Sequence, residues 1–399
     1  MNLMQVVVAI VLVAFVASSE AAQDSALQER DFKMAPGKGS VEVIDEPDGL
    51  ALKLVFPEHC KSVFATTRIP GGAPWDQAAG VSFWVKGDGS AHFGGLQLIW
   101  NENYALRYDY AFALDQTDWR KVTVAWRDFI PALPVPGSEP LDAAQGNAPS
   151  KLSQWWFGKW WYWRDDAAHS YEIRNIRLEP AVPRDDADYR PPGAALSRVA
   201  TKLRAGQPIT IVTMGDSLTD AQHWTNRETN WPLKLKRQLA EKHKVDASIA
   251  NPAIGGTQLR QNLVLLPTWI ATTPAPDLVT ICFGYNDWDA GMRGPMFREA
   301  VADAIDRIRR ATKGRADILV MTTAPSLERW TTMAELSAAC REAAKERNAG
   351  LTDLEVAFHS VSGEARAGLY VADKTHLSPV GQEIVASAVL ISLEKELLP

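Results

Sequence analysis

The stretch 209–220, ITIVTMGDSLTD, decides the fold of the second half of the chain. Its first six residues predict a β-strand, which runs directly into Gly215, Asp216 and Ser217. A serine at a strand-to-helix turn exposes its hydroxyl, and nearby backbone N–H groups can stabilise a developing negative charge. A Gly-Asp-Ser turn also fits an ordinary helix cap, so the neighbouring segments must decide between a structural and a catalytic role.

Strand and helix patterns alternate from about residue 197 to the C-terminus. The last helix is predicted to begin with Ser378 as its N-cap, followed by Pro379. One earlier helical pattern places four apolar residues on a single face: Phe297, Val301, Ile305 and Ile308. The predicted strands are Ile209–Met214, Ala247–Asn251, Leu278–Phe283, Ile318–Thr322 and Gly350–Leu354. This order predicts a doubly wound α/β domain of three layers with a five-stranded parallel sheet, which binds ligands beyond the carboxyl ends of its strands.

Three further polar segments occupy such positions. NPAIGG at 251–256 follows the second strand and ends in Gly256, and GYNDW at 284–288 follows the third and contains Asn286 and Trp288. DKTHLSP at 373–379 places Asp373 and His376 in the loop before the last helix. Each segment alone also fits a turn, but together they supply a hydroxyl, a base, a carboxylate and amide donors.

In this order the segments resemble the SGNH hydrolases, or GDSL-type esterases, over about the last 200 residues. The resemblance implies that Ser217 is the nucleophile, that His376 is the base and that Asp373 orients it. It also implies an oxyanion hole made of the backbone N–H groups of Ser217 and Gly256 and the side chain of Asn286, with no metal or other cofactor. His223, close to Ser217 in the sequence, is interpreted as a pocket-wall or surface residue.

The first half of the chain shows period-2 patterns typical of β-strands. Residues 104–114 alternate large apolar with smaller or charged side chains, and the apolar phase slips by one in YEIRNIRLE, between Ile173 and Ile176, as at a β-bulge. We therefore predict an all-β sandwich over residues 30–180, a linker at 181–196 and the hydrolase domain at 197–399. The sandwich resembles the galactose-binding-like, jelly-roll modules that accompany carbohydrate-active enzymes.

Ten of the 15 tryptophans precede residue 180, and five of them lie in SQWWFGKWWYWRDD. If this segment is a strand, Trp160 and Tyr162 point to one face and Trp161 and Trp163 to the other. Trp160, Trp161, Trp163 and Trp288 are candidate substrate-binding residues, because flat aromatic rings suit sugar faces. A packed core or a domain interface fits Trp160–Trp163 equally well.

The combination resembles two-domain carbohydrate esterases, which implies hydrolysis of short O-acyl groups, O-acetyl above all, on a polysaccharide or oligosaccharide. One alternative is a lipase, lysophospholipase or thioesterase for longer acyl chains. An alternative of another class is a carbohydrate-binding protein with an inactive hydrolase domain.

Composition sets further expectations. The net charge of −6 and pI of about 5.7 do not favour nucleic acid as a partner. An apolar run at Val6–Val16 followed by small residues predicts a signal peptide over residues 1–21, and hence a secreted or periplasmic protein with no stable membrane insertion after cleavage. The three cysteines, Cys60, Cys282 and Cys340, do not form a disulfide framework.

Overall fold

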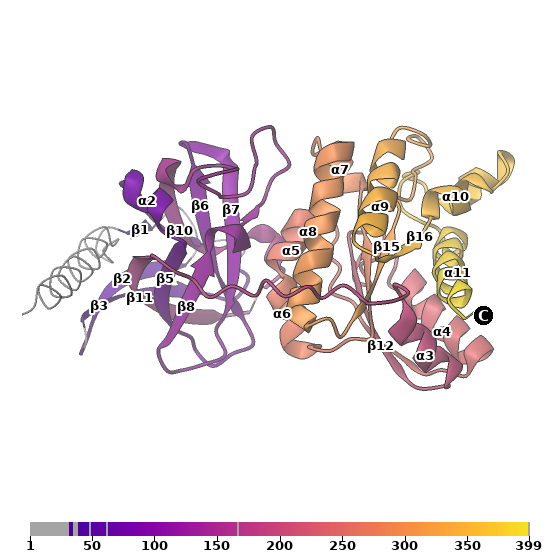
Figure 1. The fold of residues 1–399 in the computed structure, drawn as a ribbon, viewed down its shortest axis with the longest axis horizontal. Coiled ribbons are helices and arrows are strands. Elements are labelled where there is room, and N and C mark those ends of the chain that lie inside the picture. Colours follow the sequence, from indigo (N-terminus) through magenta and orange to yellow (C-terminus); the bar gives the residue numbers. More distant parts are fainter. Residues whose placement is uncertain (1–31, 35–38, 48, 61–62, 166, 398–399) are drawn as a thin grey trace, which may run out of the picture. The chain divides into compact units, whose positions relative to one another are not determined.

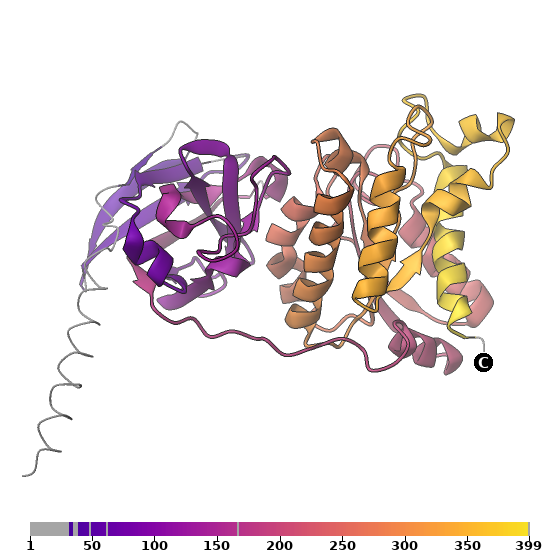
Figure 2. The same cartoon turned by 45° about the horizontal axis from the view of Figure 1, so that its top comes forward.

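The computed structural model describes residues 32–34, 39–47, 49–60, 63–165 and 167–397. The chain divides into two compact units, residues 1–184 and 185–399, which Figures 1 and 2 show in two views. The predicted signal peptide lies outside the described residues. Among the residues that are described, no helix has both the length and the apolar composition needed to cross a bilayer.

The first unit contains two antiparallel sheets, which confirms the all-β prediction. One sheet has the order β1 (Lys33–Met34), β4 (Val63–Arg68), β10 (Leu152–Lys159), β6 (Phe93–Trp100), β7 (Asn103–Ala113) and β9 (Ile130–Pro131). The other has the order β2 (Ser40–Glu46), β3 (Gly49–Phe56), β11 (His169–Glu179), β5 (Gly80–Lys86) and β8 (Arg120–Ala125). Short helical segments lie between some of the strands: α2 (Ala73–Gln77), η2 (Trp126–Asp128), η3 (Pro149–Lys151) and η4 (Trp161–Trp163).

Aromatic side chains from the facing sheets form the core of this unit. The Phe83 ring on β5 lies 5.1 Å from that of Phe112 on β7 and 5.2 Å from that of Phe157 on β10, in edge-to-face contacts. The predicted bulge is present, because the register of β11 against β5 shifts between Arg174 and Arg177.

The structure corrects the strand prediction for the tryptophan-rich segment. The chain leaves β10 at Lys159 and forms the 3₁₀ turn η4, so Trp160–Trp163 do not alternate between two faces. Trp160 and Trp163 are buried, with ring centroids 5.4 Å apart, whereas Trp161 is 55% exposed.

The second face of β7 is also buried. Asp109 on that face is fully buried and accepts hydrogen bonds from Gln97 and from the Tyr162 hydroxyl, each at 2.6 Å. Burial raises the pKa of Asp109 to about 6, although these donors and Arg107 oppose the shift. The η4 segment therefore packs on a polar layer that the alternating pattern of β7 did not reveal.

The second unit is the predicted α/β domain. Its parallel sheet has the order β13 (Ala247–Ala250), β12 (Ile209–Gly215), β14 (Leu278–Cys282), β15 (Asp317–Met321) and β16 (Gly350–Thr352). Helices cover both faces, with α8 beside α9 and α4 beside α11 (Figure 1). The helices are α3 (Ser197–Arg204), α4 (Trp231–His243), α5 (Leu259–Val264), α6 (Leu266–Thr272), α7 (Tyr285–Asp289), α8 (Gly294–Thr312), α9 (Ala334–Glu346), α10 (Leu354–His359), η5 (Glu364–Leu369) and α11 (Pro379–Lys395).

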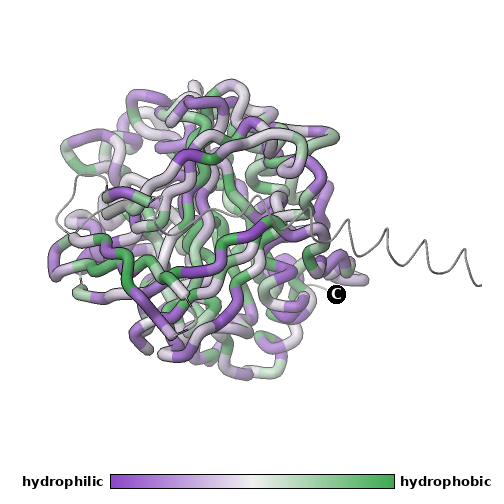
Figure 3. Tube along the Cα trace, turned by 90° about the vertical axis from the view of Figure 1, so that its left-hand side faces the viewer, coloured by the Kyte–Doolittle hydropathy of each residue, from purple (hydrophilic) through white to green (hydrophobic). Residues whose placement is uncertain are grey.

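The burial of these elements follows the patterns in the sequence. All five residues of β14 and of β15 are buried, as expected for strands covered by helices on both faces. Short hydrophobic and hydrophilic stretches alternate along the trace (Figure 3). Ser378 caps α11, since its hydroxyl accepts a hydrogen bond from the Gly381 N–H. The three cysteines are buried.

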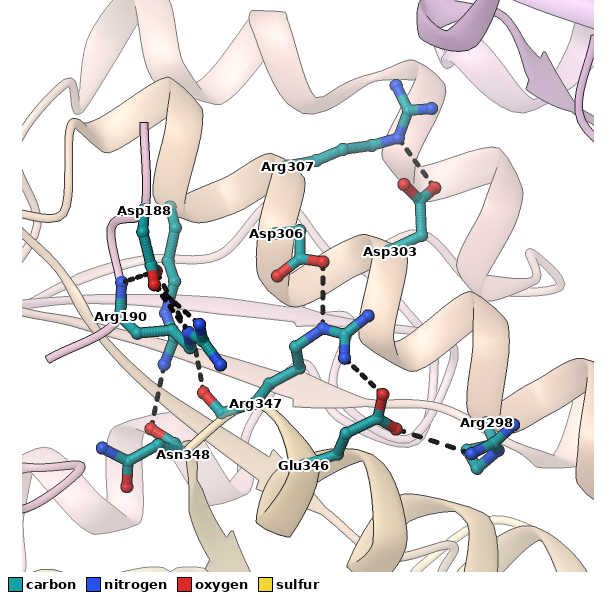
Figure 4. Close-up of polar contacts among 10 residues, drawn as sticks. Asp188, Arg190, Arg298, Asp303, Asp306, Arg307, Glu346, Arg347 and Asn348 are labelled. Carbon is teal, nitrogen blue, oxygen red and sulfur yellow. Dashed lines mark hydrogen bonds and ion pairs between the residues drawn. The ribbon is translucent and has the colours of Figure 1, made fainter. Parts of the chain in front are cut away.

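Charged side chains join α8 to the end of α9, and another charged pair lies within the chain that enters this unit (Figure 4). Arg347, which follows α9, pairs with Asp306 of α8 at 3.0 Å and with Glu346. Arg190 makes a two-pronged contact with Asp188 just before α3. Arg309 of α8 is 4% exposed and donates hydrogen bonds to the backbone carbonyls of Arg347 and Asn348.

Replacing Arg309 with methionine should lower the free energy of unfolding by about 2 kcal/mol, because two carbonyls beyond the end of α9 lose their charged donor. Thermal and urea unfolding of the full chain measure this loss. Arg237→Met, at a side chain that is 59% exposed, is the matched control and should change stability little. Equal stabilities for the two variants would contradict the role assigned to Arg309.

Candidate active site

Ser217 lies in a tight turn at the carboxyl end of β12. The turn is closed by hydrogen bonds from the Thr219 N–H to the Asp216 carbonyl and from the Leu218 N–H to the Asp216 carboxylate, both at 3.0 Å. Gly215 must be a glycine, because a Cβ there would lie 2.4 Å from the Thr219 hydroxyl oxygen. The turn thus holds Ser217 at the edge of the sheet where the loops after the parallel strands meet.

The structure brings Ser217, His376 and Asp373 together, although 159 residues separate Ser217 from His376. His376 Nε2 lies 2.9 Å from Ser217 Oγ, and His376 Nδ1 lies 2.8 Å from Asp373 Oδ2. The other carboxylate oxygen of Asp373 accepts the backbone N–H groups of Thr375 and His376, each at 2.9 Å. Partial burial opposes ionisation, but these N–H donors and the imidazole hold the pKa of Asp373 below its ordinary value.

The predicted oxyanion donors lie on loops that are tied to this turn. The Ile254 N–H donates to the Gly215 carbonyl at 3.1 Å, and the Asn286 amide donates to the Thr257 carbonyl at 3.0 Å. Gly256 has φ of +78° with open space where a Cβ would be, so the left-handed backbone is what requires glycine. Within the described residues, the N–H groups of Ser217 and Gly256 have no protein acceptor, and both remain able to donate to an oxyanion.

Replacing Asn286 with alanine should lower kcat on an acetate ester by about 100- to 1,000-fold, the usual loss for one oxyanion donor. KM should change little, because the developing charge is present mainly in the transition state. Steady-state kinetics separate the two parameters. A loss confined to KM would place Asn286 in ground-state binding instead.

The residues that support the Ser217 turn were not predicted from the sequence. Asn226 is fully buried and donates hydrogen bonds to the carbonyls of Ser217 at 2.7 Å and of Asp220 at 2.9 Å. Gln382 of α11 donates to Asn226 Oδ1 at 2.9 Å. Asp220 also accepts the Gly255 N–H at 2.9 Å. Asp220 belongs to the GDSLTD segment, but Asn226 is one polar residue among many in its loop, and no pattern distinguishes it.

Two carboxyl groups next to candidate site residues in the chain are buried: Asp216 precedes Ser217, and Asp287 follows Asn286. Burial raises the pKa of Asp216 and of Asp287 to about 7 each. Hydrogen bonds from the backbone N–H of Leu218 to Asp216 and of Leu259 to Asp287 oppose this rise. The folded protein therefore binds these protons more tightly than the unfolded chain. The associated stability is present below the unfolded pKa near 4 and is lost as the pH rises toward 7.

Replacing Asp287 with asparagine should remove part of this pH dependence. The melting temperature of the variant relative to wild type should rise between pH 4 and pH 7 and then level off. The gain is at most roughly 4 kcal/mol, since one pKa unit corresponds to about 1.4 kcal/mol. Asp246→Asn, at an exposed carboxylate, is the control. A difference between Asp287→Asn and wild type that does not vary with pH would contradict the assignment.

The candidate substrate-binding tryptophans fall into different settings. Trp288 lies on α7, two residues after Asn286, and the Arg293 guanidinium lies 3.8 Å from the centre of its ring. Trp160, Trp161 and Trp163 belong to the first unit and, as described above, only Trp161 is exposed. The sequence predicts a pocket-wall or surface position for His223, and its ring stacks on that of His376 with centroids 4.3 Å apart.

One group of side chains in the first unit has metal-ligand types. His92, Asp165 and His169 bring potential ligand atoms within 4.8 Å of one another. The two imidazoles stack nearly parallel, at 19° with centroids 4.8 Å apart, and His92 Nδ1 is hydrogen-bonded to Asp165 at 2.8 Å. Parallel rings do not direct their nitrogen lone pairs at a common ion, so this arrangement favours a hydrogen-bonded cluster.

A parallel α/β sheet that carries hydrogen-bonded Ser, His and Asp side chains beyond its strands has the architecture of a serine hydrolase. The model of the GDSL-like lipase/acylhydrolase family matches residues 213–384. The second unit of the chain is therefore an SGNH hydrolase domain of this family.

Several solved structures are similar to this chain. A lipase/acylhydrolase from Enterococcus faecalis has 22% identity and a TM-score of 0.41, and the match covers 48% of this chain and 98% of that one. An acetyl xylan esterase from Geobacillus stearothermophilus has 19% identity and a TM-score of 0.38, over 48% and 97% of the two chains. A two-domain esterase active on acetylated mannans has 20% identity and a TM-score of 0.40, over 51% and 53%. No curated protein matches the sequence.

Proposed function

We propose that this protein is a serine esterase that hydrolyses short O-acyl esters, chiefly O-acetyl, on a polysaccharide or oligosaccharide. The observation that carries the esterase assignment is the continuous hydrogen-bonded set from Asp373 through His376 to Ser217. The family of the second unit is that of lipases and acylhydrolases, which agrees with ester hydrolysis as the reaction class.

In the proposed mechanism, Ser217 Oγ attacks the ester carbonyl while His376 Nε2 takes its proton. Asp373 keeps a proton on His376 Nδ1 and stabilises the imidazolium that forms. The N–H groups of Ser217 and Gly256 and the amide of Asn286 stabilise the oxyanion. His376 then protonates the departing alcohol, and the same residues activate water to release the acid from Ser217.

The character of the triad's surroundings supports a polar alcohol. The side chains of His376 and Asp373 are 20% and 38% exposed. Thr375, between them, has its hydroxyl 3.5 Å from that of Tyr285, and Arg329 lies over the Tyr285 ring at 5.1 Å. Hydroxyl, guanidinium and aromatic groups suit a hydroxyl-rich alcohol. A long alkyl chain would instead bind best in a channel lined by aliphatic side chains.

The first experiment measures acetate release from acetylated xylan and acetylated mannan. The proposal predicts release by wild type and none by Ser217→Ala. A series of 4-nitrophenyl esters from C2 to C16 tests the acyl side, with the highest kcat/KM expected at C2 to C4. A preference for C8 or longer would favour the lipase or thioesterase alternative. Polysaccharide binding without turnover of any ester would favour the inactive binding protein.

We further propose that the protein is secreted or periplasmic, on the basis of the apolar segment at its N-terminus. Mass spectrometry of the mature protein from its native host measures the N-terminus directly. A mature chain that begins near residue 22 supports export, and an intact N-terminus in the cytosolic fraction contradicts it.

A further inference from the structure

Residues 221–230, the second part of the loop between β12 and α4, are anchored directly to Ser217. Asn226 in this loop is fully buried and donates to the backbone carbonyl of Ser217, while the Gln382 amide of α11 donates to Asn226 Oδ1. At the end of the loop, Asn230 caps α4 by accepting the Leu233 N–H at 3.1 Å. The loop is therefore fixed at both its middle and its end.

This anchored loop presents two aromatic side chains beside the catalytic imidazole. The His223 ring stacks on that of His376, with centroids 4.3 Å apart and planes at 23°. The Trp224 ring is 6.5 Å from that of His376, yet its side chain is 61% exposed. Trp224 is the most exposed of the large hydrophobic residues in the described part of the chain. The exposed indole contributes little to the core, and it lies beside the imidazole of His376.

The position of Trp224 indicates which part of the substrate it would contact. His376 must lie next to the ester oxygen that leaves, because it protonates the departing alcohol. The carbonyl oxygen instead points toward the oxyanion donors on the loops of Gly256 and Asn286. A side chain that adjoins the His376 ring therefore lies on the alcohol side of the ester.

We propose that Trp224 is a specificity-determining residue that stacks on a ring of the alcohol, a pyranose unit in a carbohydrate ester. The proposal rests on the proposed function and names the side chain that would select its alcohol. A flat indole can stack on the C–H face of a pyranose, because aromatic rings pack well on flat apolar surfaces. Because the loop is already fixed, little ordering is needed when the ring binds.

The test compares Trp224→Ala with Trp224→Phe, which retains a ring. Leu233→Ala on α4, at a residue that is 51% exposed, is the matched control for loss of a large exposed side chain. Each protein is assayed on an O-acetylated xylooligosaccharide, on cyclohexyl acetate and on ethyl acetate, with acid release followed by titration. Thermal unfolding of each variant reports whether the fold is retained.

For Trp224→Ala, the ratio of kcat/KM on the oligosaccharide to that on ethyl acetate should fall about tenfold, mainly through KM. Trp224→Phe should recover most of the ratio, and Leu233→Ala should match wild type. Equal losses on all three esters, or an unchanged ratio, would overturn the proposal. If wild type cleaves simple acetates but no sugar ester, the proposed carbohydrate substrate fails, and the ratio for cyclohexyl to ethyl acetate still decides whether Trp224 binds the ring of the alcohol.

Discussion

Replacing Ser217 with alanine should reduce kcat on a simple acetate ester by about 10⁶-fold. The hydroxyl is the group that we propose forms the acyl-enzyme, and no other side chain is hydrogen-bonded to His376 Nε2 among the described residues. The activity that remains would come from direct attack of water on the ester, with the oxyanion donors stabilising the charge that develops.

The fold of this variant should be intact, since the Ser217 hydroxyl has one hydrogen bond to the described residues, the one with His376 Nε2. Its melting temperature should lie within a few degrees of wild type. Ser360→Ala, at a hydroxyl that donates to the Ala357 carbonyl on α10, controls for loss of a serine hydroxyl and should be fully active. Substantial activity in Ser217→Ala would assign the nucleophile to another group.

Replacing Asp373 with asparagine should reduce kcat by about 10⁴-fold, as for the equivalent change in other triads. The asparagine oxygen can still accept the N–H groups of Thr375 and His376, so the loop should keep its shape. Its NH₂ group then faces His376 Nδ1 and favours the tautomer in which Nε2 carries the proton. That tautomer cannot accept a proton from Ser217.

The melting temperature of this variant, compared with its kcat, distinguishes the tautomer effect from a damaged fold. A tautomer effect leaves the melting temperature near that of wild type while kcat falls, and Asp246→Asn at an exposed carboxylate is the matched control. Full activity of Asp373→Asn would mean that another carboxylate serves His376.

Most of the catalytic unit could be predicted from its sequence. Strands buried on both faces are continuous apolar runs, and polar segments that follow them must gather at one edge of a parallel sheet. The predicted starts of four of the five strands agree with the structure, and β15 begins one residue early, at Asp317. Ser378 was identified as a cap because a serine followed by proline is a strong local signal.

Contacts that depend on distant segments could not be predicted. Trp160–Trp163 look like a strand by composition, but packing of η4 on the polar layer around Asp109 determines their conformation. The link between Asn226 and Ser217 joins two loops through a backbone carbonyl, which leaves no periodic pattern. The exposure of Trp224 likewise depends on the tertiary fold.

In the proposed mechanism, Ser217 is an activated nucleophile. A fluorophosphonate that reacts with activated serine hydroxyls, followed by peptide mass spectrometry, tests it most directly. We expect one stoichiometric label on the peptide that contains Ser217, and none on Ser217→Ala or in protein unfolded before labelling. A label on another residue, or full esterase activity in protein that takes up no label, would contradict it.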